Sequence, residues 1–274
     1  MFHIRQPAVA GAFYPAQKQL LAEDIDALLE AARLSRHTSM DEVEPLPKAI
    51  IVPHAGYIYS GEVAAAAYSR LAAAHNIIKR VILLGPVHRV PVRGLALPGF
   101  EAFATPLGEV QIDYTAVAAI ESLPQVVISP EAHLPEHSLE VQLPFLQSVL
   151  DDFKIVPLAI GDASPAEVAE VLETLWGGKE TLIVVSSDLS HFFPYQTAQL
   201  LDSQTVKDIL SLAHTLNHEQ ACGGTAINGL LLAAKHRHLQ PQLLDLRNSG
   251  DTAGDKSRVV GYASFAFTEE TDSA

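Results

Sequence analysis

Short, uniformly apolar runs recur along the chain and predict strands that are buried on both faces. Most of their residues are β-branched or leucine, and the runs span residues 49–52, 81–84, 155–160 and 182–185. A strand with no polar face fits a parallel sheet that helices cover on both sides.

Stretches with apolar residues at helical spacing lie between and around these runs and predict helices. They span residues 17–32, 62–74, 139–150, 165–176, 204–215 and 226–236. Strands that alternate with helices indicate crossover units and therefore a mostly parallel sheet.

The remaining segments complete the predicted fold. Residues 242–246 and 258–267 are apolar and predict closing strands, for which an antiparallel pairing is an option, while the polar residues 35–47 are typical of a surface loop. The whole pattern predicts one α/β domain over residues 1–274, an α/β/α sandwich around a mostly parallel or mixed central sheet.

Acidic residues outnumber basic ones, which narrows the expected partners. The 274 residues include 32 Asp and Glu against 18 Lys and Arg, a formal net charge of −14. Such a surface repels phosphate backbones and anionic lipids, so we expect neither nucleic-acid binding nor a membrane role. The lone cysteine excludes an internal disulfide, and there is neither a signal-peptide pattern nor an apolar run of roughly 18 residues. We expect a cytoplasmic protein.

A histidine follows three of the four predicted core strands: His54, His88 and His191. Ligands of open α/β sheets bind at the carboxyl ends of the strands, and neighbouring parallel strands bring these ends together. Neutral imidazole is the commonest protein ligand of zinc, iron and copper. A single loop histidine is more often a surface residue, but three at equivalent places predict a mononuclear metal pocket.

Such a pocket also needs an anionic ligand, for which Asp188, Glu140 and Cys222 are the candidates. Cys222 precedes the helix predicted from residue 226, where free N–H groups and the helix dipole favour a thiolate. Its alternative role is a small buried apolar residue. Asp188 could equally cap a turn, and His137 and Glu140 could simply open a helix.

Aromatic residues follow two of the histidines and could line a pocket for a planar ring. Tyr57 and Tyr59 follow His54, and residues 192–195 follow His191. We expect Tyr57, Tyr59 and Glu140 to contact the substrate, with ordinary loop packing as the alternative.

Several motifs, in order along nearly the whole chain, resemble the Memo family. They read PAVAGAFYP at residues 7–15, PHAGYIYSG at 53–61, LGPVH at 84–88, EHSLEVQLPF at 136–145 and VSSDLSH at 185–191. In bacteria and archaea this family is protein B of the AmmeMemoRadiSam system, a name that implies association with a radical-SAM protein and another small domain.

The resemblance implies a fold similar to the catalytic subunit of class III extradiol ring-cleaving dioxygenases. Those enzymes hold non-haem iron(II) with two histidines and a carboxylate and use a further histidine as acid/base. On this basis His54 and His88 are the histidine ligands, and His191 or His137 is the acid/base group.

The third ligand departs from that pattern. Memo-like proteins have a cysteine there, and Cys222 matches it in its Cys-Gly setting. A carboxylate from Asp188 lies in the same motif as His191, so Asp188 stays open both as the third ligand and as a catalytic group. Iron(II) is the expected ion, and a thiolate also suits copper or zinc.

Three functions remain open from the sequence. The first is a redox or dioxygenase-type enzyme that acts on a small molecule. The second is a non-catalytic module that grips a peptide or partner protein in the same cleft, as the signalling role of eukaryotic Memo proteins suggests. The third is a zinc hydrolase, which would act without dioxygen.

Overall fold

Four parallel strands form the centre of the computed structural model, which describes residues 4–35 and 45–269. In sheet order they are β2 (Ala49–Val52), β9 (Thr181–Ser186), β3 (Arg80–Pro86) and β8 (Lys154–Ile160). They contain the four apolar runs that the sequence identifies as buried strands. The order differs from the chain order, so crossover connections join them and bring their carboxyl ends to one edge.

Antiparallel strands flank this parallel centre and make the sheet mixed. On one side β12 (Val259–Thr268) pairs with β2 and is itself paired with β11 (Gln240–Asn248) and β10 (His191–Phe193). On the other side β4 (Leu95–Leu97) runs antiparallel to β8, and β7 (Val126–Ile128) lies beside it. The closing strands at the end of the chain are therefore antiparallel.

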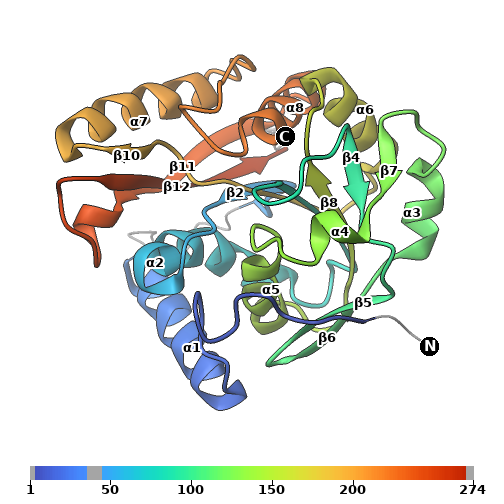
Figure 1. Cartoon of the computed structure of the whole chain (residues 1–274), viewed down its shortest axis with the longest axis horizontal. Helices are drawn as coiled ribbons and strands as arrows, with labels where there is room; N and C mark the ends of the chain where they lie inside the picture. The colour runs from blue at the N-terminus through green and yellow to red at the C-terminus, as the bar shows by residue number, and fades with distance from the viewer. Residues whose placement is uncertain (1–3, 36–44, 270–274) are drawn as a thin grey trace, which may run out of the picture.

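Side chains of one strand alternate between two hydrophobic cores, one on each face of the sheet. Ile50 and Val52 pack into one core, whereas Ile51 packs into the other. The first core is closed by α1 (Lys18–Ser35), α2 (Tyr57–Tyr68), the 3₁₀-helix η1 (Ser69–Ala74) and α5 (Leu143–Val149). The second is closed by α3 (Tyr114–Ile120), α6 (Pro165–Leu175), α7 (Tyr195–Leu210) and α8 (Gly224–His236). Figure 1 shows α1, α2 and α5 on one side of the sheet and α6, α7 and α8 on the other, so the α/β sandwich is confirmed.

Several elements differ from those expected from the sequence. The helix expected from residue 62 begins at Tyr57, directly after the N-cap Gly56, and the helix expected from residue 204 begins at Tyr195. The stretch 139–150 divides into the 3₁₀-helix η2 (Glu140–Gln142) and α5, whose first turn contains Pro144. Of the loop expected at 35–47, residues 36–44 lie outside the described residues.

The shortest elements carry no recognisable periodicity in the sequence. They are a separate sheet of β1 (Ile4–Arg5), β5 (Ala102–Thr105) and β6 (Gly108–Gln111), together with α4 (Pro130–His133) and the 3₁₀-helix η3 (Ser249–Asp251). Strand β1 pairs with β5 across almost a hundred residues of chain, which fastens the N-terminal segment to the body of the protein.

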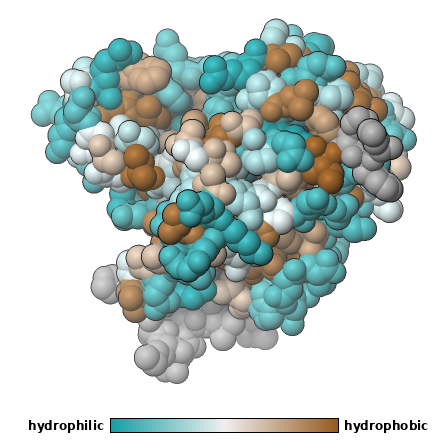
Figure 2. Space-filling model, turned by 60° about the horizontal axis from the view of Figure 1, so that its bottom comes forward, coloured by the Kyte–Doolittle hydropathy of each residue, from teal (hydrophilic) through white to brown (hydrophobic). Residues whose placement is uncertain are grey.

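Apolar side chains are scattered on the face of the molecule that Figure 2 shows. Figure 2 shows hydrophobic residues on one face as separate small patches among hydrophilic ones. Within residues 4–35 and 45–269, no helix combines the length and apolar character needed to cross a membrane.

Candidate metal centre

The carboxyl ends of β2, β9 and β3 are neighbours, and the residues that follow them meet at one place. His54 follows β2, His88 follows β3, and His191 opens β10 after β9. Cys222 joins them from the turn before α8. The expected convergence of strand-end histidines is thus confirmed by the order of the strands.

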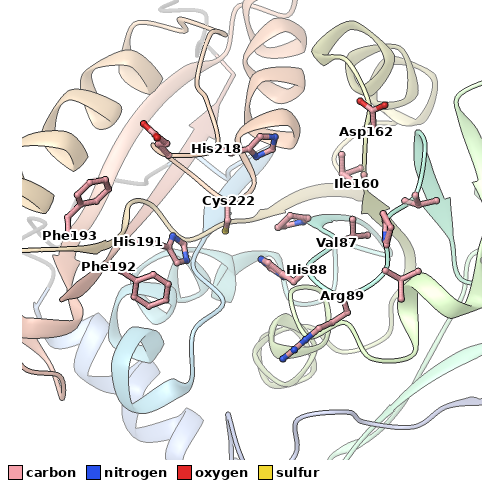
Figure 3. Close-up of a pocket in the computed structure, with 16 residues that line it drawn as sticks. Val87, His88, Arg89, Ile160, Asp162, His191, Phe192, Phe193, His218 and Cys222 are labelled. Carbon is pink, nitrogen blue, oxygen red and sulfur yellow. The ribbon is translucent and has the colours of Figure 1, made fainter.

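Ligand atoms of His54, His88 and Cys222 lie within 4.8 Å of one another. The His54 Nε2 atom is 3.3 Å from the Cys222 Sγ atom, and the rings of His54 and His88 meet edge to face with centroids 5.1 Å apart. Figure 3 shows the rings of His88 and His191 on either side of the Cys222 sulfur. Ligand atoms of one tetrahedral ion lie about 3.3–3.7 Å apart at ordinary metal–nitrogen and metal–sulfur distances. The ligand atoms of His54, His88 and Cys222 would therefore need to move only slightly closer together to bind one ion.

A hydrogen-bond relay fixes the orientation of the buried His54 ring. Its Nδ1 atom lies 2.9 Å from the Ser186 hydroxyl, which donates its one proton to the Ser138 carbonyl and also accepts a bond from Gln142. Because the hydroxyl proton is already used, Nδ1 must carry the proton that it donates to Ser186. The lone pair is then on Nε2, which faces Cys222. Burial lowers the pKa of His54 to about 3, so the ring is neutral at pH 7.

The electrostatics of Cys222 differ from the sequence-based expectation. Burial, together with the nearby Asp188 carboxylate, raises the pKa of the Cys222 thiol to about 12. The expected lowering by the helix N-terminus is therefore wrong for the metal-free chain, since desolvation outweighs the helix dipole. A cation that replaced the thiol proton would balance this charge, because the thiolate is the form that binds metals.

The donor set fits a transition-metal ion on this geometry. Two imidazoles and one thiol bring their ligand atoms together, and the thiol lies in contact with the His54 ring. Nitrogen and sulfur donors of this softness suit iron, copper or zinc and are poor ligands for magnesium or calcium.

His191 and His137 complete the histidine cluster. The Nδ1 atom of His191 lies 2.8 Å from the Leu189 carbonyl and must donate to it, so in the neutral tautomer the lone pair is on Nε2. The His137 ring stacks on His88 with centroids 4.8 Å apart and meets His54 edge to face at 5.4 Å. Burial lowers the pKa of His137 to about 4.

Asp188 lies beneath the site and is buried. Its Oδ1 atom accepts the backbone N–H of His54 at 2.7 Å, and its carbonyl accepts the N–H of Cys222 at 3.3 Å. Burial raises the pKa of the Asp188 carboxyl. Among the described residues, Asp188 belongs to neither group of converging ligand atoms, whereas Cys222 does.

Glu140 and Tyr57 do not reach the pocket, which corrects their expected contact with substrate. Glu140 is completely buried and forms an ion pair with Arg5 at 2.6 Å, and its oxygens also accept the Tyr14 hydroxyl and two backbone N–H groups. Tyr57 is buried between Tyr14 and Phe145 and donates its hydroxyl proton to the Val141 carbonyl. Both residues stabilise the core around the site.

The pocket itself is a hollow of about 890 Å³ at the carboxyl edge of the sheet. Its lining, of which Figure 3 shows the main part, comprises residues 86–92, 160–162, 191–193, 218, 219 and 222. Tyr59, expected here from the sequence, is half-buried and is not among the lining residues of this pocket. Phe192 lines the pocket with a φ of 63° and an exposed ring.

Several residues of the site cannot be recognised from their local sequence. Ser186 and Gln142 orient His54, and Glu136 contacts His88 through both carboxylate oxygens. His218 lines the pocket although its local sequence is typical of a solvated residue. The only available clue was position, since Ser186 and Glu136 each lie inside a motif that also contains a site histidine.

Comparisons with known proteins agree with the motifs. A model of the family described as Memo-like protein matches residues 5–266. A MEMO1 family protein of Archaeoglobus fulgidus is 36% identical over 281 residues, which cover 96% of this chain and 99% of that relative. A MEMO1 family protein of Aquifex aeolicus is 36% identical over 282 residues, with the same two coverages. A solved structure of an uncharacterized protein from Escherichia coli K12 is 15% identical, with a TM-score of 0.49, and covers 79% of this chain and 98% of its own.

The family match spans nearly the whole chain, and the relatives exceed 30% identity over almost their full length. The chain therefore belongs to the Memo family.

Proposed function

We propose that this protein binds one iron(II) ion through His54, His88 and Cys222 and uses the adjoining pocket for a dioxygen-dependent oxidation. The observation that carries the proposal is the convergence of two imidazole nitrogens and one thiol within 4.8 Å at the carboxyl edge of the sheet. A redox-active ion held there would supply electron transfer to dioxygen and Lewis-acid polarisation of a substrate hydroxyl. Copper would suit the same donors.

His191 is the group we assign to proton transfer. Its Nδ1 proton is held by the Leu189 carbonyl, which leaves the Nε2 lone pair free to accept a proton from a substrate hydroxyl. The imidazolium that forms would lie near the buried Asp188 carboxylate, and opposite charges attract strongly where water is excluded. Asp188 would thus act on the proton-transfer step, and His137 is the second candidate for the same role.

The pocket supports an aryl or other planar substrate. Phe192 presents an exposed ring at the lining, next to His191 with ring centroids 5.7 Å apart. A planar ring could stack on Phe192 while its hydroxyl groups point toward His191 and Cys222.

Oxygen uptake tests this proposal. Protein purified without oxygen and loaded with iron(II) is screened with aromatic diols on an oxygen electrode. We expect diol-dependent uptake that falls at least about 100-fold in His191→Gln with bound iron unchanged, since general acid–base catalysis contributes about 10²–10⁴-fold. The matched control His236→Gln changes an exposed histidine on α8 and should behave as the parent does.

The alternative is a non-catalytic module that binds a peptide or partner protein. The pocket is compatible with this role, because its volume of about 890 Å³ lies near the upper end of the range for ligand sites and its lining includes both charged and apolar residues. A module of this kind would show saturable peptide binding and no oxygen uptake with any diol. Zinc in place of iron, with hydrolysis that continues without dioxygen, would point instead to a hydrolase.

A further inference from the structure

Glu136 lies beside the candidate metal site and makes an unusually complete set of bonds. Its Oε1 atom accepts from the His88 Nδ1 atom and from the backbone N–H groups of His137 and Ser138, each at 2.9 Å. Its Oε2 atom accepts the backbone N–H of His88 at 2.6 Å. The carboxylate is buried. Through these bonds it holds both the ring and the backbone of His88.

We propose that Glu136 is a positioning residue that sets the tautomer and the ring orientation of His88. A carboxylate oxygen only accepts, so the His88 nitrogen that faces it must carry the proton. This leaves the lone pair on Nε2, the atom that can bind an ion together with His54 and Cys222. A hydrogen bond of this kind also makes the imidazole a stronger donor.

Glu136 could instead be read as a ligand, since His88, Glu136 and His137 also bring ligand atoms within 4.8 Å of one another. The bonds of the carboxylate argue against this. Four N–H groups already occupy its two oxygens, and three of them are backbone groups: those of His137 and Ser138 beside Glu136, and that of His88 after β3. An ion bound there would leave buried N–H groups without acceptors, at a cost of about 1–3 kcal/mol each.

Arg5 anchors the loop that carries Glu136. Arg5 donates to the carbonyls of Glu136 and His133 and forms its ion pair with Glu140, all in the buried interior. The guanidinium thereby ties three positions of residues 133–140 to the N-terminal segment. His88 thus receives its orientation from a loop that is itself rigidly held.

The inference rests on the proposed metal site, and a cobalt(II) titration without oxygen separates the two. The thiolate charge-transfer band reports Cys222, and the ligand-field bands report the geometry around the ion. We expect Glu136→Gln to weaken cobalt binding about 10–100-fold and to shift the ligand-field bands, because the amide cannot accept all four N–H bonds.

Asp113→Asn is the matched control. It makes the same carboxylate-to-amide change in a buried residue that pairs with Arg80 and caps α3, at the opposite end of β3. It should lose stability yet bind cobalt with the affinity and spectrum of the parent. Parent affinity and spectrum in Glu136→Gln would overturn the inference, whereas a parent that binds no cobalt would overturn the metal site itself.

A measurement on the unmodified protein covers the case in which Glu136→Gln does not fold. Long-range ¹H–¹⁵N spectra of the metal-free protein distinguish the two histidine tautomers. We expect His88 to have a protonated Nδ1 and an unprotonated Nε2, and the opposite tautomer would refute the role of Glu136.

Discussion

The buried ion pair between Arg5 and Glu140 gives a prediction that separates structural from functional roles. The Arg5 residue is 1% exposed and Glu140 is 0% exposed, with 2.6 Å between Nη1 and Oε2. In Glu140→Gln the guanidinium keeps its two carbonyl partners but loses the one carboxylate that pairs with it within residues 4–35 and 45–269. Breaking a buried pair by neutralising one member costs about 3–5 kcal/mol, because the remaining charge stays buried without compensation.

The other bonds of Glu140 place the loss within that range. Its Oε2 atom also accepts the Ala8 N–H at 2.7 Å, while Oε1 accepts the Val9 N–H at 3.0 Å and the Tyr14 hydroxyl at 2.6 Å. The glutamine amide has one acceptor oxygen, so its NH₂ group must face either the donors at the Oε2 position (Arg5 and the Ala8 N–H) or those at the Oε1 position (the Val9 N–H and the Tyr14 hydroxyl). The Tyr14 hydroxyl can rotate and accept, which limits the additional loss to about 1 kcal/mol.

Urea unfolding monitored by circular dichroism measures this loss. We expect Glu140→Gln to lower the free energy of unfolding by about 4 kcal/mol, with a melting temperature lower by about 10 °C. The control Glu173→Gln removes an exposed pair with Arg237 and should change the free energy by less than about 1 kcal/mol. A loss below about 1 kcal/mol in Glu140→Gln would refute the structural role, as would parent stability combined with loss of ligand binding.

Two further predictions concern close packing and pH. In Gly223→Ala the new Cβ atom would lie 2.7 Å from Ser187 Cβ and 2.9 Å from the Ser186 carbonyl oxygen, which is too close for ordinary packing. Because the neighbouring Cys222 must then shift, we expect a free energy of unfolding about 1–3 kcal/mol lower and a weaker cobalt–thiolate band. Parent values of both quantities would contradict this. Burial lowers the pKa of His133 to about 4, against about 6.5 in the unfolded chain. Between these pH values the unfolded chain binds more protons, so acidification lowers the free energy of unfolding by up to about 1.4 kcal/mol per pH unit. His133→Gln keeps a donor for the Ala96 carbonyl but cannot titrate, and an unchanged pH slope in this variant would show that His133 does not contribute.

The central strands could be predicted from the sequence because burial on both faces removes every polar residue from them. The alternation of Ile50 and Ile51 between two cores is the structural counterpart of this pattern. The short strands β4 to β7 have three or four residues each, too few to show a period, and their positions depend on partners distant in the chain.

The site could be predicted only to the level of residue type and strand end. The convergence of His54 and His88 follows from the order of β2, β9 and β3, which chain order alone does not give. Glu140 was misassigned because its partner Arg5 lies 135 residues away in the chain. The pKa of Cys222 was misjudged because the helix terminus is visible in the sequence, whereas the desolvation by surrounding residues is not.

Metal content tests the central claim most directly. The parent protein and the variants His54→Ala, His88→Ala and Cys222→Ser are purified without oxygen, and bound metal is measured by elemental analysis alongside circular dichroism spectra. We predict close to one iron or copper ion per chain in the parent and almost none in each folded variant. Absence of metal from the parent, or a Cys222→Ser variant that binds as much as the parent does, would contradict a site formed by His54, His88 and Cys222.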